Sequence, residues 1–324
     1  MLDQENICLS VEKTQREYKS VAPEIVQTSS FQFDDFQHYV DVNMNKKSAY
    51  TYTRGENPTL TILEEKLAQL EKGECAKVFA SGMGAISATI LSLVQQKDHI
   101  VIVNTVYGST VKFIQNLERF GVESTKIDVS STEDIFAFVK DNTRMIYFES
   151  PSSQKFEMLD LEMISQFAKQ RNIITVIDNT WATPLFQNPL VHGIDIVIHS
   201  CSKYIGGHSD LVGGVVISNQ KYIHEINGFG QIFLGATMSP MNAWLALRGL
   251  RTLPVRLKSQ EQSVKQVIQF LQQILYVKKI YHPMVHTSTD LTDKYLKGYG
   301  SLLSFVLKDA TPDVIERFVD SLKH

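Results

Sequence analysis

Short apolar runs alternate with amphipathic stretches along the middle of the chain. The runs are rich in β-branched and aromatic residues, which is typical of buried strands. They lie at Lys77–Ala80, Ile100–Val103, Met145–Phe148, Ile173–Ile177, Ile194–Ile198 and Gly214–Ile217. Most stretches between them have apolar residues at helical spacing, so the pattern predicts strands and helices in turn.

Helices are predicted on both sides of these runs as well as between them. Leu60, Leu63, Leu67 and Leu70 lie at helical spacing, and Gly73 follows as a helix-ending residue. The other predicted helices cover residues 85–94, 110–120, 133–140, 161–170 and 244–250, and, after a break near Pro254, a segment that ends at Tyr276. A weaker strand at Leu302–Leu307 and a last helix at Asp313–Leu322 complete the pattern.

This alternation places the protein in the α/β class, with a mostly parallel sheet that helices cover on both faces. We expect three regions: an N-terminal arm at 1–55, a central domain at 56–250 and a smaller α+β domain at 251–324. The arm has little periodicity, and a long arm of this kind often wraps a second subunit. The last domain ends within its final helix, so we expect it to be incomplete. In sheets of this class, a ligand binds at the carboxyl ends of the strands.

Composition narrows the class of protein further. The chain has 324 residues, of which 43% are hydrophobic and 21% charged, and these values exclude a disordered chain, a collagen-like repeat and a coiled coil. A net charge of -3 gives no indication of a nucleic acid or an anionic membrane as partner. No apolar stretch is long enough to span a membrane. Cys8, Cys75 and Cys201 are scattered without a CxxC pair, which favours a reducing, cytoplasmic setting.

The most informative segment for chemistry begins where the strand at Ile194–Ile198 ends. Lys203 follows, with Ser200 and Ser202 before it and a pair of glycines after it. Burial beside a strand would lower the pKa of this lysine and make it a nucleophile toward an aldehyde. The two serines are two residues apart on an extended segment, so both hydroxyls could donate to one phosphate. Taken alone, the segment also fits a solvated loop lysine.

A carboxylate follows another strongly apolar strand. Asp178 comes directly after Ile177, and an isolated buried carboxylate is costly, so this side chain needs a partner. The partner is either the N-terminus of a later helix or the protonated nitrogen of a pyridine ring. In the second case, Asp178 and Lys203 would hold opposite ends of pyridoxal phosphate, with the aldehyde on the lysine.

A glycine-rich turn joins the first apolar run to the helix after it. The segment Ala80–Ala85 reads ASGMGA, so Gly82 and Gly84 remove side-chain bulk from the start of a helix. Backbone N–H groups at such a start bind anions, although a tight strand–helix turn without a ligand has the same pattern. With Ser200 and Ser202 nearby in the fold, the turn would form a phosphate site.

The histidines indicate no metal site. His192 and His208 have no carboxylate or cysteine at ligand spacing, so we predict no metal. His199 is expected in the core at the end of its strand. Cys201 lies between the two serines and is expected to point to the opposite side, into the core.

Further motifs accompany these residues in a fixed order. They are YTRGENPT at 52–59, SGMG at 81–84, YGST at 107–110, DNT at 178–180, SxSK at 200–203 with GHSD at 207–210, and SPxxAWxxLRGLRTL at 239–253. In order and spacing they resemble the Cys/Met-metabolism pyridoxal-phosphate enzymes, the cystathionine γ-synthase and cystathionine β- and γ-lyase group of fold type I. The resemblance covers about residues 45 to 308 and implies that the central domain binds pyridoxal 5'-phosphate.

The resemblance implies a role for each matching residue. Lys203 would bind the aldehyde of the cofactor and move the substrate proton, and Asp178 would pair with the ring nitrogen. Tyr107 would stack on the ring and assist the loss of the sulfur group, although without the other motifs it fits a core aromatic beside a turn. The phosphate would be bound by Ser81, Gly82, Met83, Ser200 and Ser202.

The resemblance also implies an assembly. Tyr52 and Arg54 would reach the cofactor phosphate of a neighbouring subunit, because a guanidinium group holds phosphate through two hydrogen bonds. The chain would then form a homodimer that assembles to a homotetramer. Without the other motifs, Arg54 fits a surface arginine before an Asn-Pro turn.

Two features depart from the family pattern. Ser153 stands where the family has an asparagine that contacts the ring oxygen of the cofactor, so that role is not transferred. Family chains continue beyond the point where this one ends, and the missing part normally holds the arginine that binds the substrate carboxylate. Arg317 lies too early to match it. The expectation is therefore a fragment, or a natural truncation that binds amino acids poorly.

The activity implied is that of a pyridoxal-phosphate-dependent carbon–sulfur lyase of transsulfuration, with cystathionine or a similar sulfur amino acid as substrate. Trp181 and the SPSS segment at 150–153 resemble bacterial cystathionine β-lyases, whereas YGST and YTRGENPT resemble the γ branch.

The alternatives are a cystathionine γ-synthase-type transferase and a truncated cofactor-binding chain with little activity. An aminotransferase is disfavoured by the motifs at 52–59 and 239–253. A methionine γ-lyase is disfavoured because that branch typically has cysteine where Ser109 stands.

Overall fold

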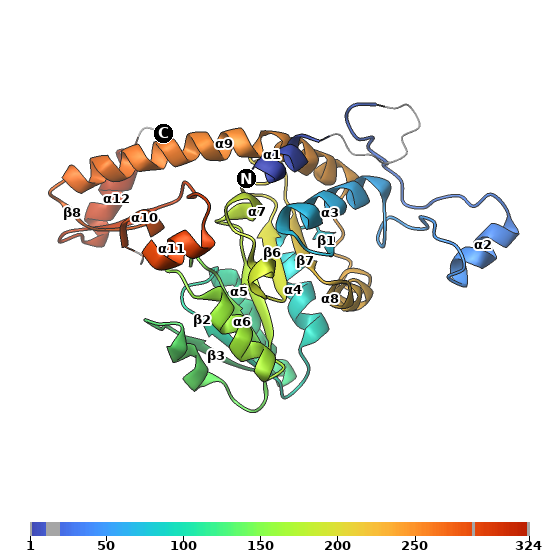
Figure 1. Cartoon of the computed structure of the whole chain (residues 1–324), viewed down its shortest axis with the longest axis horizontal. Helices are drawn as coiled ribbons and strands as arrows, with labels where there is room; N and C mark the ends of the chain where they lie inside the picture. The colour runs from blue at the N-terminus through green and yellow to red at the C-terminus, as the bar shows by residue number, and fades with distance from the viewer. Residues whose placement is uncertain (1, 11–19, 287–288, 323–324) are drawn as a thin grey trace.

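A sheet of seven strands forms the centre of the molecule, whose computed structural model describes residues 2–10, 20–286 and 289–322 (Figure 1). The strand order is β1-β7-β6-β5-β4-β2-β3, and β7 runs antiparallel to both of its neighbours while the other pairs are parallel. The predicted α/β class with a mostly parallel sheet is confirmed. The strands are β1 (Cys75–Phe79), β2 (His99–Val103), β3 (Glu123–Ile127), β4 (Thr143–Phe148), β5 (Ile174–Asp178), β6 (Ile196–Ser200) and β7 (Gly214–Ser218).

Six of these strands coincide with the predicted apolar runs. The seventh, β3, lies outside them because it forms the edge of the sheet and its residues Glu123–Ile127 are mostly polar. An edge strand pairs on one side only, so it needs no continuous apolar run. Polar edges of this kind also discourage pairing with other chains.

Helices cover both faces of the sheet because successive strand residues point to opposite faces. In β2, Ile100 and Ile102 pack with α4 (Gly82–Leu93) and α5 (Gly108–Asn116). Val101 and Val103 pack on the other side with α6 (Leu161–Gln170). Burial on both faces explains why the predicted runs are continuously apolar rather than alternating.

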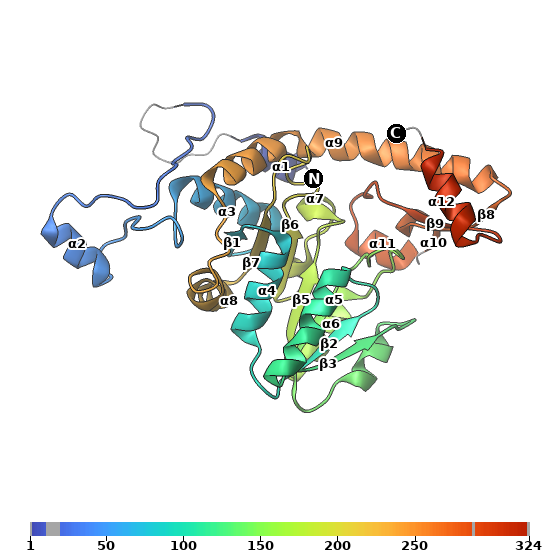
Figure 2. The ribbon, with the colours of Figure 1, turned by 180° about the vertical axis from the view of Figure 1, so that it is seen from behind.

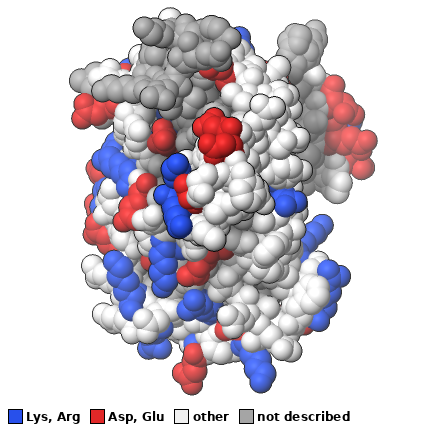
Figure 3. Space-filling view, turned by 90° about the vertical axis from the view of Figure 1, so that its right-hand side faces the viewer, with Lys and Arg blue, Asp and Glu red and all other residues white. Residues whose placement is uncertain are grey.

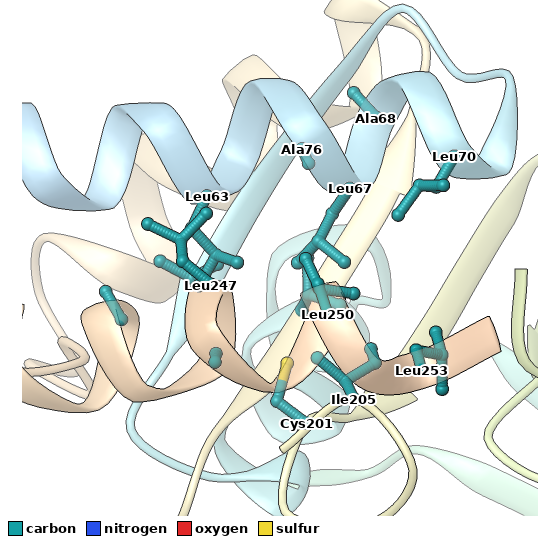
Figure 4. Close-up of a cluster of buried hydrophobic side chains, with 14 of the residues drawn as sticks. Leu63, Leu67, Ala68, Leu70, Ala76, Cys201, Ile205, Leu247, Leu250 and Leu253 are labelled. Carbon is teal, nitrogen blue, oxygen red and sulfur yellow. The ribbon is translucent and has the colours of Figure 1, made fainter. Parts of the chain in front are cut away.

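A third apolar cluster joins two helices over β1 and β7. Figure 4 shows Leu63 and Leu67 of α3 (Pro58–Glu71) beside Leu247 and Leu250 of α9 (Pro240–Gln273), with Cys201 in the same cluster. Cys201 is fully buried, as predicted. The segment that carries the candidate lysine is therefore anchored in a packed core.

The predicted break near Pro254 is wrong, because Pro254 lies inside α9, a single helix of 34 residues. A proline removes one helical hydrogen bond. Here Leu250, Leu253 and Leu257, on both sides of the proline, are buried in the same apolar cluster, and this packing holds the two halves in one helix. The predicted helix at 133–140 is a shorter 3-10 helix, η2 (Glu133–Phe138).

The first 55 residues contain a docked helix as well as an extended arm. Helix α1 (Leu2–Leu9) packs against α3 and α9, Cys8 is fully buried, and the Gln4 amide donates to the Leu70 carbonyl at 2.9 Å. Helix α2 (Phe36–Asn43) has no buried residue and projects away from the body in both views (Figures 1 and 2). The division of the chain at residue 55 stays a prediction.

Helix α9 leads from the central sheet to the C-terminal elements, which lie together below its far end in Figure 1. They are β8 (Val277–Tyr281), α10 (Pro283–His286), α11 (Thr289–Tyr295), β9 (Ser304–Leu307) and α12 (Pro312–Asp320), and β8 pairs antiparallel with β9. The remaining elements are η1 (Leu117–Phe120), α7 (Thr183–Phe186), η3 (Pro189–His192), α8 (Gln220–Glu225) and the π-helix η4 (Ile226–Gln231).

The surface carries charges of both signs. On the face shown in Figure 3, lysine and arginine side chains are interspersed with aspartate and glutamate, outside the grey residues that the structure does not describe. Among the helices that the structure describes, none combines the length and the apolar character that crossing a bilayer requires.

Candidate active site

Asp178 and Ser200 are joined across the ends of β5 and β6 by a single hydroxyl group. The Asp178 carboxylate accepts from the backbone N–H of Thr180 at 3.0 Å and from its hydroxyl at 2.5 Å. The same hydroxyl oxygen accepts from the backbone N–H of Ser200 at 2.8 Å. Thr180 therefore fixes Asp178 relative to Ser200. Thr180 has no such role predicted from the sequence. The pattern that could have indicated it is a hydroxyl residue two positions after an aspartate, which is typical of a local turn.

The glycine-rich turn lies directly against Ser200. Ser81 begins α4, and its Oγ accepts from the backbone N–H of Gly84 at 2.9 Å. A Cβ added at Gly82 would lie 3.1 Å from the Cβ of Ser200. Since this distance is tighter than ordinary packing, a side chain at Gly82 would push the helix start away from the strand end. The first N–H groups of α4, including that of Met83, are thus placed near Ser200, an arrangement that binds phosphate.

Ser202 and Lys203 lie on the turn that follows β6. The Ser202 hydroxyl accepts from the Gly213 N–H at 3.0 Å, and the backbone N–H of Lys203 donates to the Ser200 carbonyl at 3.2 Å. The Lys203 side chain is exposed, and its Nζ has no acceptor among the residues that the structure describes. The expectation that the strand would bury this lysine is wrong for a single chain, because β6 ends at Ser200 and, in the turn that follows, Cys201 is buried while the Lys203 side chain is exposed.

Tyr107 lies at the start of α5, on a loop that Glu149 holds in place. Its side chain is 53% exposed, so it is not a core aromatic. The backbone N–H of Tyr107 donates to one Glu149 carboxylate oxygen at 2.6 Å, and the Ser153 hydroxyl donates to the other at 2.5 Å. In the same region, the Thr110 hydroxyl lies 3.9 Å from the sulfur of Met83, which brings the loop next to the glycine-rich turn.

Glu149 has no role predicted from the sequence, although its position at the end of an apolar strand matches that of Asp178. Glu149 directly follows the apolar strand β4, as Asp178 ends β5. What the sequence could not show is that the Glu149 carboxylate joins Tyr107 to Ser153, because these contacts depend on the loop after β2 lying beside β4.

Burial perturbs both carboxyl groups. It raises the pKa of Glu149 to about 8, and the nearby Asp178 carboxylate adds to this rise. Burial also raises the pKa of Asp178, while the hydrogen bonds from Thr180 and the proximity of His199 lower it. Part of Asp178 is accessible to solvent, but surrounding protein atoms still desolvate its carboxylate. In the described part of the chain, neither group forms an ion pair with lysine or arginine.

These residues fit pyridoxal phosphate. Asp178 is a desolvated carboxylate that pairs with no lysine or arginine of the described ranges, and a protonated ring nitrogen would supply a positive charge. Gly82 allows the N-terminus of α4 to lie against Ser200, since a Cβ there would come within 3.1 Å of the Ser200 Cβ, and a helix N-terminus beside a serine suits a phosphate group. The Lys203 amine is free to bind an aldehyde.

Tyr52 and Arg54 lie outside this arrangement. The guanidinium carbon of Arg54 is 5.4 Å from the centre of the Tyr52 ring, and both side chains are exposed. The Arg54 carbonyl accepts from the Thr237 hydroxyl at 3.1 Å. No hydrogen bond within the described ranges joins either side chain to the serines and glycines of the predicted phosphate site.

The histidines take structural positions. His199 is buried, as predicted, and its Nε2 lies 2.6 Å from the Glu71 carboxylate. His192 lies 2.9 Å from Glu162 through its Nδ1. Across the residues described, no three histidine, cysteine, aspartate or glutamate side chains are grouped so that they could hold a metal ion.

A mostly parallel sheet with a lysine, an aspartate and a helix N-terminus gathered at the carboxyl ends of its strands defines the protein as a fold type I pyridoxal-phosphate enzyme. The family model described as "Cys/Met metabolism PLP-dependent enzyme" matches residues 6–324. The chain belongs to this family, and its cofactor is pyridoxal phosphate.

Similar proteins agree with this assignment. The chain is 38% identical to L-methionine gamma-lyase of Fusobacterium nucleatum subsp. polymorphum over 296 residues, 90% of this chain and 75% of the relative. It is 36% identical to cystathionine beta-lyase of Lactococcus lactis subsp. cremoris over 314 residues, 96% of this chain and 80% of the relative. The crystal structure of cystathionine gamma synthase from Xanthomonas oryzae pv. oryzae in complex with cystathionine matches with a TM-score of 0.90 and 31% identity, covering 100% of this chain and 82% of that chain. The prediction of a pyridoxal-phosphate-dependent carbon–sulfur lyase of transsulfuration is confirmed.

Glu149 makes the stability of the cofactor-free protein depend on pH. An unfolded glutamate has a pKa of about 4.3, so between this value and about 8 the folded state keeps a proton that the unfolded state has released. We therefore expect the free energy of unfolding to fall as the pH rises through this window. Glu149→Gln should flatten the decrease, and urea unfolding at a series of pH values measures it. The exposed Glu118→Gln is the control, and an unchanged slope in Glu149→Gln contradicts the raised pKa.

Proposed function

We propose that this enzyme eliminates the sulfur group of cystathionine, by β-elimination as in a cystathionine β-lyase or by γ-elimination as in a cystathionine γ-lyase. The observation that carries the proposal is the exposed Tyr107, whose loop Glu149 fixes beside the glycine-rich turn. A phenol at the rim of the cofactor site can move a proton to or from a departing sulfur atom. The similarity to a synthase solved with cystathionine supports this substrate.

Each residue of the site then has a stated task. When bound, pyridoxal phosphate supplies an aldehyde that holds an amino acid and a ring that accepts electrons from its Cα. The Nζ of Lys203 binds the aldehyde between turnovers and, once displaced, removes the Cα proton. The Asp178 carboxylate keeps the ring nitrogen protonated. Tyr107 stacks on the ring and assists loss of the sulfur group, and the phosphate is bound by Ser81, Gly82, Met83, Ser200 and Ser202.

The oxoacid that is released distinguishes β-elimination from γ-elimination. With cystathionine, β-elimination releases homocysteine, pyruvate and ammonia, whereas γ-elimination releases cysteine, 2-oxobutyrate and ammonia. We expect one of the two oxoacids to accumulate with the purified enzyme. Lys203→Ala is the control for background chemistry. Release of neither oxoacid, with the cofactor bound, would overturn the proposal.

Product analysis with other substrates tests two further candidates. A cystathionine γ-synthase-type transferase is favoured by the similarity to the Xanthomonas enzyme, and it would join cysteine to an activated homoserine instead. A methionine γ-lyase is favoured by the 38% identity to the Fusobacterium enzyme, and it would release 2-oxobutyrate from methionine. Ser109, where that branch typically has cysteine, argues against the second candidate.

The assembly we propose is a homodimer that pairs to a homotetramer. Tyr52 and Arg54 are exposed, and among the described residues neither side chain bonds to the proposed phosphate residues of its own chain, which supports their use by a neighbouring subunit. Within each chain, residues 1–55 would act as the arm, 56–250 as the cofactor domain and 251–324 as the smaller domain. The free cysteines Cys8, Cys75 and Cys201 support a cytoplasmic setting.

Mixed dimers test the shared site. An Arg54→Ala chain and a Lys203→Ala chain should each be inactive alone, because each lacks one part of every site. Mixed in equal amounts, half of the dimers are hybrid with one intact site of two, so about a quarter of the wild-type activity should return. Mixing Lys203→Ala with Asp178→Asn is the control, since both residues lie in the same chain's half of the site. Equal activity in the two mixtures would contradict a shared site.

A further inference from the structure

We propose that Glu71 is a positioning residue for the cofactor: its single buried carboxylate holds together the strand ends that carry Asp178 and Ser200. This inference rests on the proposed roles of these two residues in cofactor binding. Glu71 ends helix α3, on the side of β5 and β6 opposite to the cofactor residues, and its side chain is fully buried.

One oxygen of Glu71 makes both contacts. The amide nitrogen of Asn179 donates to Glu71 Oε1 at 2.7 Å, and His199 Nε2 lies 2.6 Å from the same oxygen. Asn179 and His199 are each 1% exposed. A further hydrogen bond, from Asn188 to the other oxygen at 3.3 Å, supports the carboxylate from the loop after α7. Glu71 therefore contacts two strand ends at one point.

Strand alternation explains why this contact reaches the cofactor site. Neighbouring residues of an extended segment point to opposite sides. Asn179 follows Asp178, and His199 precedes Ser200, so the side chains that turn toward Glu71 alternate with those that turn toward the cofactor. On the cofactor side Thr180 joins Asp178 to Ser200, and on the far side Glu71 joins Asn179 to His199. The two strand ends are thus fixed on both faces.

The contact is also electrostatic. A fully buried carboxylate needs a hydrogen-bonding or cationic partner, and the imidazole of His199 is the partner nearest to Glu71. The same imidazole lowers the pKa of Asp178. Replacing the Glu71 carboxylate would therefore release the His199 imidazole from its place beside Asp178, the residue proposed to meet the ring nitrogen.

Helix α3 offers a matched control in Glu64. This second buried carboxylate lies two turns earlier on the same helix, and it contacts Lys77 Nζ at 3.3 Å and the Val78 N–H at 3.1 Å. Both partners belong to β1, and neither neighbours a proposed cofactor residue in the sequence. Glu64→Gln should therefore lower the free energy of unfolding, as Glu71→Gln does, without displacing Asp178 or Ser200.

The test measures the dissociation constant of pyridoxal phosphate for the 324-residue apoprotein, by titration of visible absorbance, together with urea unfolding of each variant. Glu71→Gln should raise this constant about tenfold or more, as is typical when a group behind a binding residue is lost. Glu64→Gln should change the dissociation constant less than about twofold, although it lowers the free energy of unfolding by a similar amount. If Glu71→Gln does not fold, His199→Gln removes the other half of the contact and should give the same rise.

The results for these variants show whether the positioning role of Glu71 fails alone or together with the proposed role of Asp178. A constant within twofold of wild type in Glu71→Gln, or an equal rise in Glu64→Gln, overturns the positioning role. Asp178→Asn is the reference variant for the site itself. If Asp178→Asn weakens cofactor binding and Glu71→Gln does not, only the inference fails. If Asp178→Asn leaves the constant unchanged, the proposed role of Asp178 fails, and the inference fails with it.

Discussion

Replacing Lys203 with alanine is expected to lower the turnover of cystathionine by at least about a thousandfold, because in the proposed function one amine both binds the cofactor aldehyde and moves the Cα proton. The side chain is exposed and unpaired within the described chain, so its removal leaves no buried gap. The variant should fold as the wild type does. Some cofactor should remain bound through the phosphate site at α4 and Ser200.

Borohydride reduction followed by peptide mapping measures this assignment directly. Reduction should fix the cofactor to the peptide that contains Lys203 and leave Lys203→Ala unlabelled. Lys221→Ala is the control, since Lys221 is also exposed and its described contact is the ring of Tyr222 at 5.8 Å. A label on a peptide with another lysine would overturn the role of Lys203.

Asp178→Asn should have the second largest effect. Asparagine keeps the size of the side chain and its hydrogen bond with Thr180 but cannot balance a protonated ring nitrogen. Breaking a buried charged pair costs about 3–5 kcal/mol. This corresponds to a loss of about a hundredfold to several thousandfold in cofactor affinity or in rate. Equilibrium titration with pyridoxal phosphate and steady-state rates measure the two effects separately.

Asp195→Asn is the matched control for this variant. Asp195 immediately precedes β6, at the amino ends of the same strands, and its carboxylate accepts from the Thr175 N–H at 2.9 Å and hydroxyl at 2.8 Å. It should therefore affect stability without changing cofactor affinity. Equal losses of affinity in the two variants would show that Asp178 acts through the fold rather than through contact with the cofactor.

The pattern of apolar and polar residues along the chain predicted the strands of the sheet better than it predicted the helices. Apolar runs identify strands buried on both faces, because few polar residues are tolerated there. Edge strand β3 and helix α1 lack such runs, and each is held by pairing or packing with distant residues. Pro254 shows the reverse case, in which a local helix breaker is outweighed by leucines packed on both sides of it.

The sequence by itself determined the family, the cofactor and the candidate residues at the strand ends, since these depend on residue type and on spacing along the chain. Only the tertiary structure decided how Glu149 holds Tyr107 and Ser153, how Thr180 joins Asp178 to Ser200, and that Lys203 is exposed in a single chain. It alone also brought Glu71 to His199, 128 residues further along the chain. The physical reason is that a hydrogen bond reaches about 3 Å, so its partners are set by how strands and helices pack rather than by their order in the sequence.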